Sequence, residues 1–412
     1  MVQKKKILQP RLLAHIGQES KLAQTQRQII SYYINQGPAT VSDLAHYINL
    51  SIPTANKIIS ELVDNGFVQV YGKKETSGGR QPILYGMHPQ AGKFVGVDVQ
   101  HECVNMGIID LMGSELSSEY NIPFNLTNDV EKIDELCGLI TDFIQRNGVE
   151  SQDLLSIHIN LPGRINPRLG RSFTFLKDTE EKPLAQMFSD RLGFRVSIDN
   201  DTRGMAYGEF THGVPSELGA QNALYLNMSW GMGLGIIIDG KIYAGKSGFS
   251  GELGHISVYD NEILCHCGKK GCLQTEISGQ ALHRTILERI ASGEVSILSE
   301  KVQQGQSVSL EDIITAINKE DVLCLQALEI IGRKLGKRIA GLINIFNPEV
   351  LVIGGALART GESIRQPVET VMRTYSLGIV NRDTEIRIAA LGEKAGVMGS
   401  CMMARTRCFE VL

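Results

Sequence analysis

Several residues that commonly bind metal ions lie within one short stretch of the sequence. His255 is followed by Cys265, Cys267 and Cys272, and His266 lies between the first two cysteines. Thiolates and an imidazole are typical ligands of tetrahedral Zn²⁺, and four protein ligands exclude water, as in a structural site. His266 competes with His255 as the fourth ligand, although its place between two cysteines makes its geometry awkward. The alternative is a set of unligated buried thiols, which the tight spacing and two turn glycines disfavour.

The composition is that of folded globular domains. The chain has 412 residues, of which 42% are hydrophobic and 21% are charged, and this length indicates about two to four domains. Eight cysteines are too few for a disulfide scaffold. No apolar run approaches the roughly 18 residues of a membrane-spanning helix, and the start, MVQKKKILQP, lacks the apolar stretch of a signal peptide. We expect a soluble cytoplasmic protein with no membrane partner.

The net charge of −4 is unevenly distributed. Residues 1–90 contain ten Lys and Arg against five Asp and Glu, and the remainder contains 31 against 40, so the two parts carry +5 and −9. A basic end on an acidic body is typical of a nucleic-acid-binding module attached to another domain. Five surplus charges can also belong to a solvated surface.

Residues 1–88 have the helix pattern of a winged helix-turn-helix domain. Apolar residues recur at helical spacing over 22–36 and 41–48. A third helix is expected between Ser51, a suitable N-cap, and the Asn-Gly pair at 65–66. In such domains the third helix enters the major groove of DNA.

The wing of this domain is expected at residues 67–87. Strands at 67–71 and 83–87 flank a glycine-rich, basic turn, as in a β-hairpin that contacts phosphates. The alternative is a helical interaction domain with a charged hairpin. The residues of helix and wing that we expect to contact DNA are Thr54, Asn56, Lys57, Lys73, Lys74 and Arg80.

From residue 92 the chain alternates strands and helices in two comparable halves. Each opens with strand, turn and strand: FVGVDVQHECVNMGIIDLMG in the first half and LYLNMSWGMGLGIIIDGKIYAG in the second. Such halves predict an α/β protein with a cleft between two lobes. We assign the first lobe to 92–215, joined by a C-terminal helix at 392–412, and the second lobe with the Cys/His loop to 216–391. The hairpin turns could hold nucleotide phosphates, or the repeat could be structural only.

Four motifs together make the sequence resemble the ROK family of repressors, open reading frames and sugar kinases. They are GELGH at 251–255, CHCGKKGCL at 265–273, DND at 199–201 and NPEVLVIGG at 347–355. The resemblance covers essentially the whole chain, because the regulators of this family, which include N-acetylglucosamine, glucose and xylose repressors, carry an N-terminal winged helix. It implies an actin-like (ribonuclease H-like) body of two α/β lobes with a sugar site in the cleft. It also implies structural zinc bound by His255, Cys265, Cys267 and Cys272.

The same resemblance implies the sugar-binding residues. Asn200 and Asp201 match an Asn-Asp pair whose Asp is the general base in the kinases of the family. Glu252 and His255 match its sugar-contacting Glu and His, so His255 would serve both the metal and the sugar. Where the family usually has Glu after CL, this chain has Gln274, which can hydrogen-bond a hydroxyl without carrying a charge. Asp201 could equally cap the helix that follows it.

The nucleotide-binding turns depart from those of the kinases. ATP-using members of the family have a Gly-Gly-Thr-rich turn after the first Asp, whereas Asp98 is followed by VQHE at 99–102. In the second turn, Ser-Trp at 229–230 replaces the usual Gly-Thr. Phosphoryl transfer depends on positioning and on charge neutralisation. We therefore expect most kinase activity to be lost even with Asp201 in place.

These observations predict a sugar-responsive transcriptional regulator of carbohydrate metabolism, in the first place a repressor. Its body is expected to bind a hexose or N-acetylhexosamine, free or phosphorylated, with different affinity in two conformations. A two-fold symmetric operator requires a homodimer or homotetramer. The alternative is an ATP- and Mg²⁺-dependent sugar kinase, of the glucokinase or N-acetylglucosamine kinase type, with an appended DNA-binding domain. A third possibility is a body that docks a protein such as a sugar transporter component.

Overall fold

The computed structural model describes residues 10–17, 20–75, 81–129, 131–176 and 182–410. The chain divides into two compact units, Met1–Asp201 with Ser400–Leu412, and Thr202–Gly399. Within the described ranges, every helix is too short or too polar to cross a membrane.

The N-terminal part of the first unit is a winged helix-turn-helix, as the sequence predicts. Its small sheet has the strand order β1-β3-β2, and β2 and β3 form an antiparallel hairpin. Ser51 caps the third predicted helix by accepting a hydrogen bond from the backbone N–H of Thr54. The elements are α1 (Arg11–Ile16), α2 (Lys21–Gln36), β1 (Ala39–Thr40), α3 (Val41–Tyr47), α4 (Ile52–Asp64), β2 (Val68–Lys73) and β3 (Ile83–Met87).

The rest of the first unit is built on a five-stranded sheet with the order β10-β7-β4-β5-β6. Strands β4, β5 and β6 form an antiparallel meander, and β7 and β10 run parallel to β4. The elements are β4 (Lys93–Val99), β5 (Cys103–Asp110), β6 (Glu115–Pro123), α5 (Glu131–Arg146), β7 (Leu154–Leu161), β8 (Ile165–Asn166), β9 (Arg171–Ser172), α6 (Leu184–Leu192), β10 (Val196–Asn200) and the C-terminal helix α16 (Lys394–Glu410).

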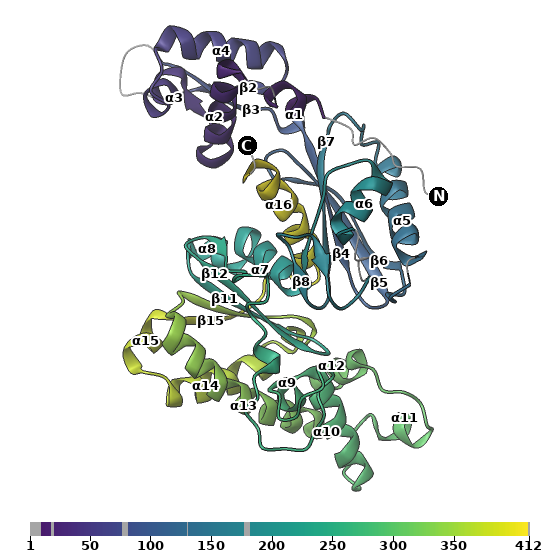
Figure 1. Cartoon of the computed structure of the whole chain (residues 1–412). Helices are drawn as coiled ribbons and strands as arrows, with labels where there is room; N and C mark the ends of the chain where they lie inside the picture. Colours follow the sequence, from purple (N-terminus) through teal and green to yellow (C-terminus); the bar gives the residue numbers. More distant parts are fainter. Residues whose placement is uncertain (1–9, 18–19, 76–80, 130, 177–181, 411–412) are drawn as a thin grey trace. The chain divides into compact units, whose positions relative to one another are not determined.

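Strand β4 is buried on both faces, because helices cover both sides of this sheet (Figure 1). Val95 and Val97 pack in one apolar cluster with α5 and α6. On the opposite face, Gly96 lies against α16, and a Cβ at this position would come within 2.4 Å of the backbone nitrogen of Cys401. The hydroxyl of Ser400 donates to the carbonyl oxygen of Val97 at 3.0 Å. The end of α16 therefore packs on the first unit, as the sequence predicts.

The second unit repeats the same plan. Its sheet has the order β13-β12-β11-β14-β15, in which β11, β12 and β13 are antiparallel and β14 and β15 are parallel to β11. The strands are β11 (Ala223–Met228), β12 (Met232–Ile238), β13 (Lys241–Ile242), β14 (Val350–Gly354) and β15 (Glu385–Ile388). The helices are α7 (Asp201–His212), α8 (Val214–Leu218), α9 (Gln274–Ile277), α10 (Gly279–Ala291), α11 (Ser299–Gln303), α12 (Leu310–Asn318), α13 (Val322–Phe346), α14 (Glu362–Tyr375) and α15 (Gly378–Asp383). Short 3₁₀ turns occur at Leu253–His255 and Ala356–Thr360 in this unit and at Pro89–Ala91 in the first unit. The predicted α/β class and the predicted internal repeat are confirmed.

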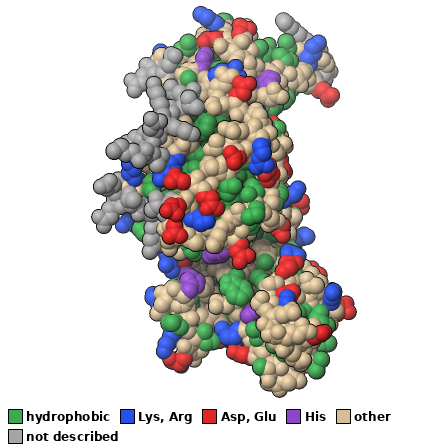
Figure 2. All heavy atoms as spheres, turned by 90° about the vertical axis from the view of Figure 1, so that its right-hand side faces the viewer, with side chains coloured by type: hydrophobic (Ala, Val, Ile, Leu, Met, Phe, Trp, Pro, Cys, Tyr) green, Lys and Arg blue, Asp and Glu red, His purple; other side chains and the backbone are tan. Residues whose placement is uncertain are grey.

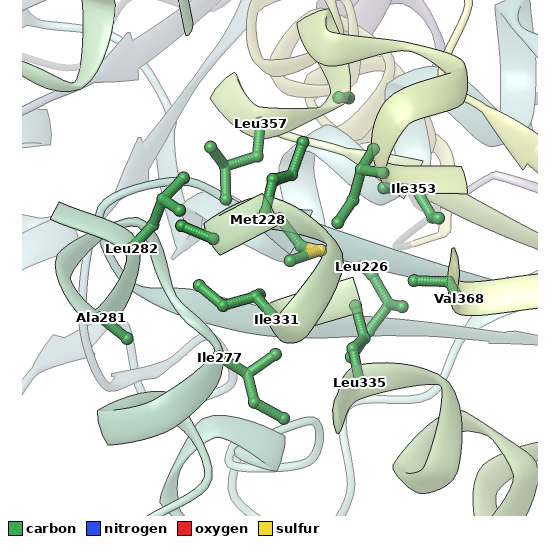
Figure 3. Packing of buried hydrophobic residues seen from close by; sticks show 14 of the residues in the cluster. Leu226, Met228, Ile277, Ala281, Leu282, Ile331, Leu335, Ile353, Leu357 and Val368 are labelled. Atoms are coloured by element: carbon green, nitrogen blue, oxygen red, sulfur yellow. The ribbon is translucent and has the colours of Figure 1, made fainter. Parts of the chain in front are cut away.

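The largest apolar core lies on one face of this second sheet. Leu226 and Met228 of β11 point toward Ile331 and Leu335 of α13, and Val368 of α14 packs beside them (Figure 3). Helix α7 covers the other face, where Ala206 packs with Tyr225 and Val352. Two covered faces explain why β11 and β14 are buried along their whole length.

The boundaries between the units differ from the predicted limits. We expected the second lobe to begin at 216 and the C-terminal helix to belong to the first lobe from 392, whereas the units divide at Asp201/Thr202 and Gly399/Ser400. Helix α7 and the start of α16 belong to the second unit because their backbones are in close contact there. A Cβ on Gly208 of α7 would lie 2.2 Å from the carbonyl oxygen of Ala395. The limits 1–88, 92–215 and 216–391 remain a prediction for independently folding domains.

Candidate functional site

The predicted metal ligands lie together in the second unit. Ligand atoms of His255, Cys265, Cys267 and Cys272 all lie within 4.8 Å of one another. The Nδ1 atom of His255 is 3.5 Å from the Sγ atom of Cys265, and the Sγ atoms of Cys267 and Cys272 are 3.6 Å apart. One imidazole and three thiols around one point form a donor set that fits a metal ion.

Tight turns and short bridges hold this loop. Cys265 accepts a backbone hydrogen bond from Gly268 at 2.9 Å and donates one to Lys269 at 2.8 Å, which closes a turn around the first two cysteines. Gly271 has a φ of 74°, and a Cβ there would lie 2.1 Å from the carbonyl oxygen of Tyr259. Only glycine fits this position, which brings Cys272 back to the other thiols.

The thiol of Cys272 is protonated at neutral pH when no metal is bound. Burial, followed by the neighbouring thiols of Cys267 and Cys265, raises the pKa of Cys272 to about 12. A metal ion that binds to Cys272 must displace this proton, so its affinity will increase with pH. The Nε2 atom of His255 lies 3.7 Å from a carboxylate oxygen of Glu252. Glu252 can therefore orient the imidazole.

Gln274, which the resemblance assigns to the sugar, contacts the cluster. Its side chain is at the start of α9 and is only 6% exposed. Its Nε2 atom lies 3.3 Å from the Sγ atom of Cys265 and 2.8 Å from the Nδ1 atom of the exposed His266. This link between Gln274 and the metal ligands was missed from the sequence. Contact of Gln274 with a sugar remains a prediction.

Polar residues of the first unit gather where the parallel strands end. Asp98 of β4 pairs in register with Asn160 of β7, which pairs with Asp199 of β10. The Nδ2 atom of Asn200 donates to the carboxylate of Asp201 at 2.7 Å and to the carbonyl oxygen of Gly163 at 2.9 Å. The sequence analysis missed Asn160, although a polar residue near the end of the apolar strand LLSIHINL was a usable signal. This edge provides amide and carboxylate groups of the kind that bind sugar hydroxyls.

The carboxyl group of Asp98 has a raised pKa. The residue is 1% exposed, and this burial raises its pKa to about 7; the hydrogen bond from Gln100 opposes the shift and the charge of Asp201 adds to it. Because the folded state binds this proton more tightly than the unfolded chain, Asp98 lowers stability as pH rises from about 4 to about 7.

Asp98→Asn is therefore expected to stabilise the protein at pH 8 and to leave its stability unchanged near pH 4. The raised pKa limits the gain to about 4 kcal/mol. Urea unfolding at both pH values measures it, with Asp142→Asn on the exposed side of α5 as control. An equal gain from Asp98→Asn at pH 4 and pH 8 would contradict the assignment.

The second turn that was considered for nucleotide binding, at residues 229–230, takes part in hydrogen bonds within the protein. The hydroxyl of Ser229 accepts from the backbone N–H of Ala356, at 3.1 Å, and donates to the side chain of Asn227. The N–H groups of Gly279 and Gln280 at the start of α10 donate to the carbonyl oxygens of Ser229 and Trp230. Within the turn, the backbone N–H of Ser229 donates to the carbonyl oxygen of Gly231 at 3.1 Å. A backbone N–H group that already has a partner is a poor ligand for a phosphate.

Helix α4 presents a polar surface. Thr54, Asn56 and Lys57 are exposed, whereas Ile58, Ile59 and Leu62 are buried. These polar side chains are therefore accessible on the surface of α4, and their contact with DNA remains a prediction. Acidic, basic and apolar side chains are interspersed on the face of the molecule in Figure 2, so no large field of one sign marks that face.

The wing residues differ in their surroundings. Lys73 is exposed at the end of β2, whereas the Nζ atom of Lys74 lies 2.9 Å from the carboxylate of Asp43 in α3. This exposed ion pair connects the base of the wing with the helical part of the domain. Arg80 lies outside the described residues, and its contact with DNA remains a prediction.

Comparison with known proteins identifies both parts of the chain. Residues 94–407 match the ROK family, and residues 22–69 match a family described as winged helix-turn-helix DNA-binding. The xylose repressor of Caldicellulosiruptor bescii is 28% identical over 367 residues, which cover 87% of this chain and 90% of the relative. The DNA-binding transcriptional dual regulator NagC of Escherichia coli strain K12 is 25% identical and covers 97% of each chain.

A solved structure shows the same architecture. The crystal structure of a ROK family transcriptional regulator, described as a homologue of the E. coli MLC protein, is 26% identical and superimposes with a TM-score of 0.78. The match covers 94% of this chain and 97% of that one. With its family match over 94–407 and its repeated pair of five-stranded α/β sheets, the chain belongs to the ROK family.

Proposed function

We propose that this protein is a transcriptional repressor that releases its operator when a sugar binds to the ROK body. One observation carries this proposal: a winged helix with an exposed polar third helix is joined to a ROK body in one chain, and repressors match 87% to 97% of that chain. In such a protein the sugar must bind the operator-bound and the free conformation with different affinity.

The effector is expected to be a neutral sugar or its phosphate. The relatives are named for xylose and for N-acetylglucosamine. A pentose is therefore a candidate effector in addition to the hexoses and N-acetylhexosamines expected from the sequence. Asn200 and Asp201 in the first unit and Glu252 and His255 in the second are the proposed sugar ligands. Amide and carboxylate groups form paired hydrogen bonds with neighbouring hydroxyls, which supports this assignment.

The metal of the Cys/His cluster is proposed to be zinc, bound through His255, Cys265, Cys267 and Cys272. For Zn–S bonds of about 2.3 Å, a tetrahedron has edges of about 3.8 Å, close to the 3.6 Å between the Sγ atoms of Cys267 and Cys272. When bound, zinc would hold the loop in its fold and fix the imidazole of His255 beside Glu252. Four protein ligands leave no open position for catalysis, so its role is structural.

The kinase alternative is supported by Asp201, which the family resemblance matches to the general base of the kinases. It is opposed by the internal hydrogen bonds of the second turn and by the protonated state that burial favours for Asp98. Incubation of the protein with ATP, Mg²⁺ and a sugar panel decides between them, because a kinase forms ADP in proportion to sugar phosphate.

The DNA-binding part of the proposal is tested by selection from random duplexes with the full chain. A dimer or tetramer should select a two-fold symmetric site whose half-sites lie about 10 base pairs apart or a multiple of this. Selected sites without symmetry, bound by a monomer in sedimentation, would contradict the proposed assembly.

Arg80→Ala in the wing is expected to weaken binding to operator and to unrelated duplexes by a similar factor. A phosphate contact adds affinity without sequence information, so its loss reduces the slope of log K against log salt by about one per contact. Fluorescence anisotropy at several salt concentrations measures both quantities. An unchanged affinity with an unchanged slope would remove Arg80 from the DNA interface.

A further inference from the structure

The C-terminal helix α16 contacts both the strand that leads to the proposed sugar ligands and the DNA-binding domain. From Ser400 onward this helix belongs to the first unit, together with both of these parts. Arg405 and Arg407 are two positions apart in the chain. Because an α-helix turns by about 100° per residue, their side chains leave the helix about 200° apart around its axis. The two arginines therefore reach in different directions from one helix.

Arg407 holds the end of β10. Its guanidinium forms an ion pair with Asp199 and donates to the carbonyl oxygen of Ile198 at 3.0 Å. Asp199 is 1% exposed, and its other carboxylate oxygen accepts a hydrogen bond from the backbone N–H of Asn200 at 2.7 Å. A carboxylate buried to this extent needs a cationic partner, because an unpaired charge in the interior is strongly disfavoured. Arg407 therefore fixes, through Asp199, the backbone at Asn200 of the proposed sugar site.

Arg405 reaches the DNA-binding domain. Its Nε atom donates to the carbonyl oxygen of Leu111 at 2.8 Å, and its Nη2 atom donates to the carbonyl oxygen of Ile34, near the end of α2, at 3.4 Å. The last carbonyl groups of a helix lack partners within the helix and carry partial negative charge. Helix α2 has no basic residue in its last turn, so Arg405 supplies the cation there. Gln26 of α2 in turn donates to Glu61 of α4, the expected recognition helix, at 3.4 Å.

The part of α16 that precedes these arginines is bonded to the sheet. The hydroxyl of Ser400 donates to the carbonyl oxygen of His158 in β7 at 2.8 Å, and the hydroxyl of Ser156 in β7 donates to the carbonyl oxygen of Ala404 at 3.0 Å. Strand β7 pairs with β10 along the whole of β10. A displacement at the end of β10 is therefore passed to α16 through the sheet as well as through Arg407.

We infer that α16 couples the sugar site to the DNA-binding domain, with Arg407 as its contact on the sugar side and Arg405 as its contact on the DNA side. The inference rests on the function proposed above. The amide of Asn200 donates to Asp201 and to the carbonyl oxygen of Gly163. A sugar hydroxyl bound at this pair competes for these hydrogen bonds and so displaces the end of β10. The displacement of α16 that follows changes the contact of Arg405 with α2 and, with it, the affinity for the operator.

The test measures a coupling factor, the ratio of the operator affinities of the full chain without and with sugar. Xylose, glucose, N-acetylglucosamine and their phosphates are tested on the wild type, and the one that releases the selected operator is used for the variants. Arg405→Met keeps a long side chain and removes the guanidinium. Substitutions that act on such coupling change it by about 2- to 30-fold. We expect a decrease in this range, with the affinity for sugar in the absence of DNA close to that of the wild type.

A second readout follows from the reciprocity of linked binding. The operator must weaken sugar binding by the same factor by which sugar weakens operator binding, so both factors should decrease together in Arg405→Met. Arg407→Met should lower the affinity for sugar as well as the coupling factor. Arg407→Lys, which retains the charge beside Asp199, should restore part of both.

Arg11→Met is the matched control. Arg11 of α1 also joins the DNA-binding domain to the body, through an ion pair with Asp153 at 3.0 Å, but this ion pair does not involve α16. The control should retain the wild-type coupling factor. A wild-type factor in Arg405→Met, or an equal decrease in Arg11→Met, would overturn the role of α16. A wild-type chain that none of these sugars releases from the operator would instead contradict the proposed function.

Discussion

Cys265→Ser is expected to abolish metal binding and to melt the second unit at a much lower temperature. Serine cannot supply a thiolate, and three remaining ligands do not close a tetrahedral site. A metal present at 1,000 times its dissociation constant stabilises the folded state by about 4 kcal/mol. For a unit of this size, its loss corresponds to a decrease in Tm of about 8 to 16 °C. Metal content by mass spectrometry and thermal unfolding measure both effects.

The same substitution should also abolish the response to sugar, because the loop that carries Glu252 and His255 loses its support. Cys103→Ser, a change of the same type outside the cluster, serves as control and should retain metal, stability and response. A wild-type protein that is purified under reducing conditions and contains no metal, or a Cys265→Ser variant that still contains one per chain, would contradict the structural metal site.

Lys57→Glu on α4 should weaken operator binding by at least about 30-fold. The residue is exposed beside Thr54 and Asn56, and its reversal removes one contact and adds repulsion from a phosphate. Each such contact contributes about 1–3 kcal/mol, and two copies in a dimer give at least about 2 kcal/mol, or 30-fold. Anisotropy titration with labelled operator measures the change.

Lys21→Glu is the matched control for this prediction. It makes the same change of charge at an exposed lysine of the same domain, at the start of α2 and outside the recognition helix. The affinity of the Lys21→Glu variant for the operator should decrease only slightly, because the domain carries less positive charge overall. An equal decrease in operator affinity for Lys57→Glu and Lys21→Glu would contradict the role of α4 as the recognition helix.

The features predicted correctly from the sequence are those that depend on local spacing. The Cys/His cluster occupies one loop, so the positions of its cysteines and of two turn glycines were sufficient to predict that these side chains lie together. Metal binding by the cluster remains a prediction. The winged helix was found in the same way, because Ser51 and the stripe of Ile58, Ile59 and Leu62 define α4 without distant contacts.

The features that were missed depend on residues far apart in the chain. Asp98 is buried because α16, some 300 residues later, covers β4, and no local pattern reveals this. The sequence predicted Lys74 as a cation of the wing that contacts DNA, whereas the structure pairs it with Asp43 of α3.

The account is tested most directly by measuring the affinity of the full chain for its selected operator during titration with individual sugars, in the absence and presence of ATP. We expect one sugar or sugar phosphate to reduce the affinity by 10-fold or more without ATP, and Mg-ATP to add no effect and to yield no ADP. If no sugar changes the affinity for DNA while ATP is consumed and a sugar phosphate accumulates, the protein is a kinase and the proposed repressor mechanism is wrong.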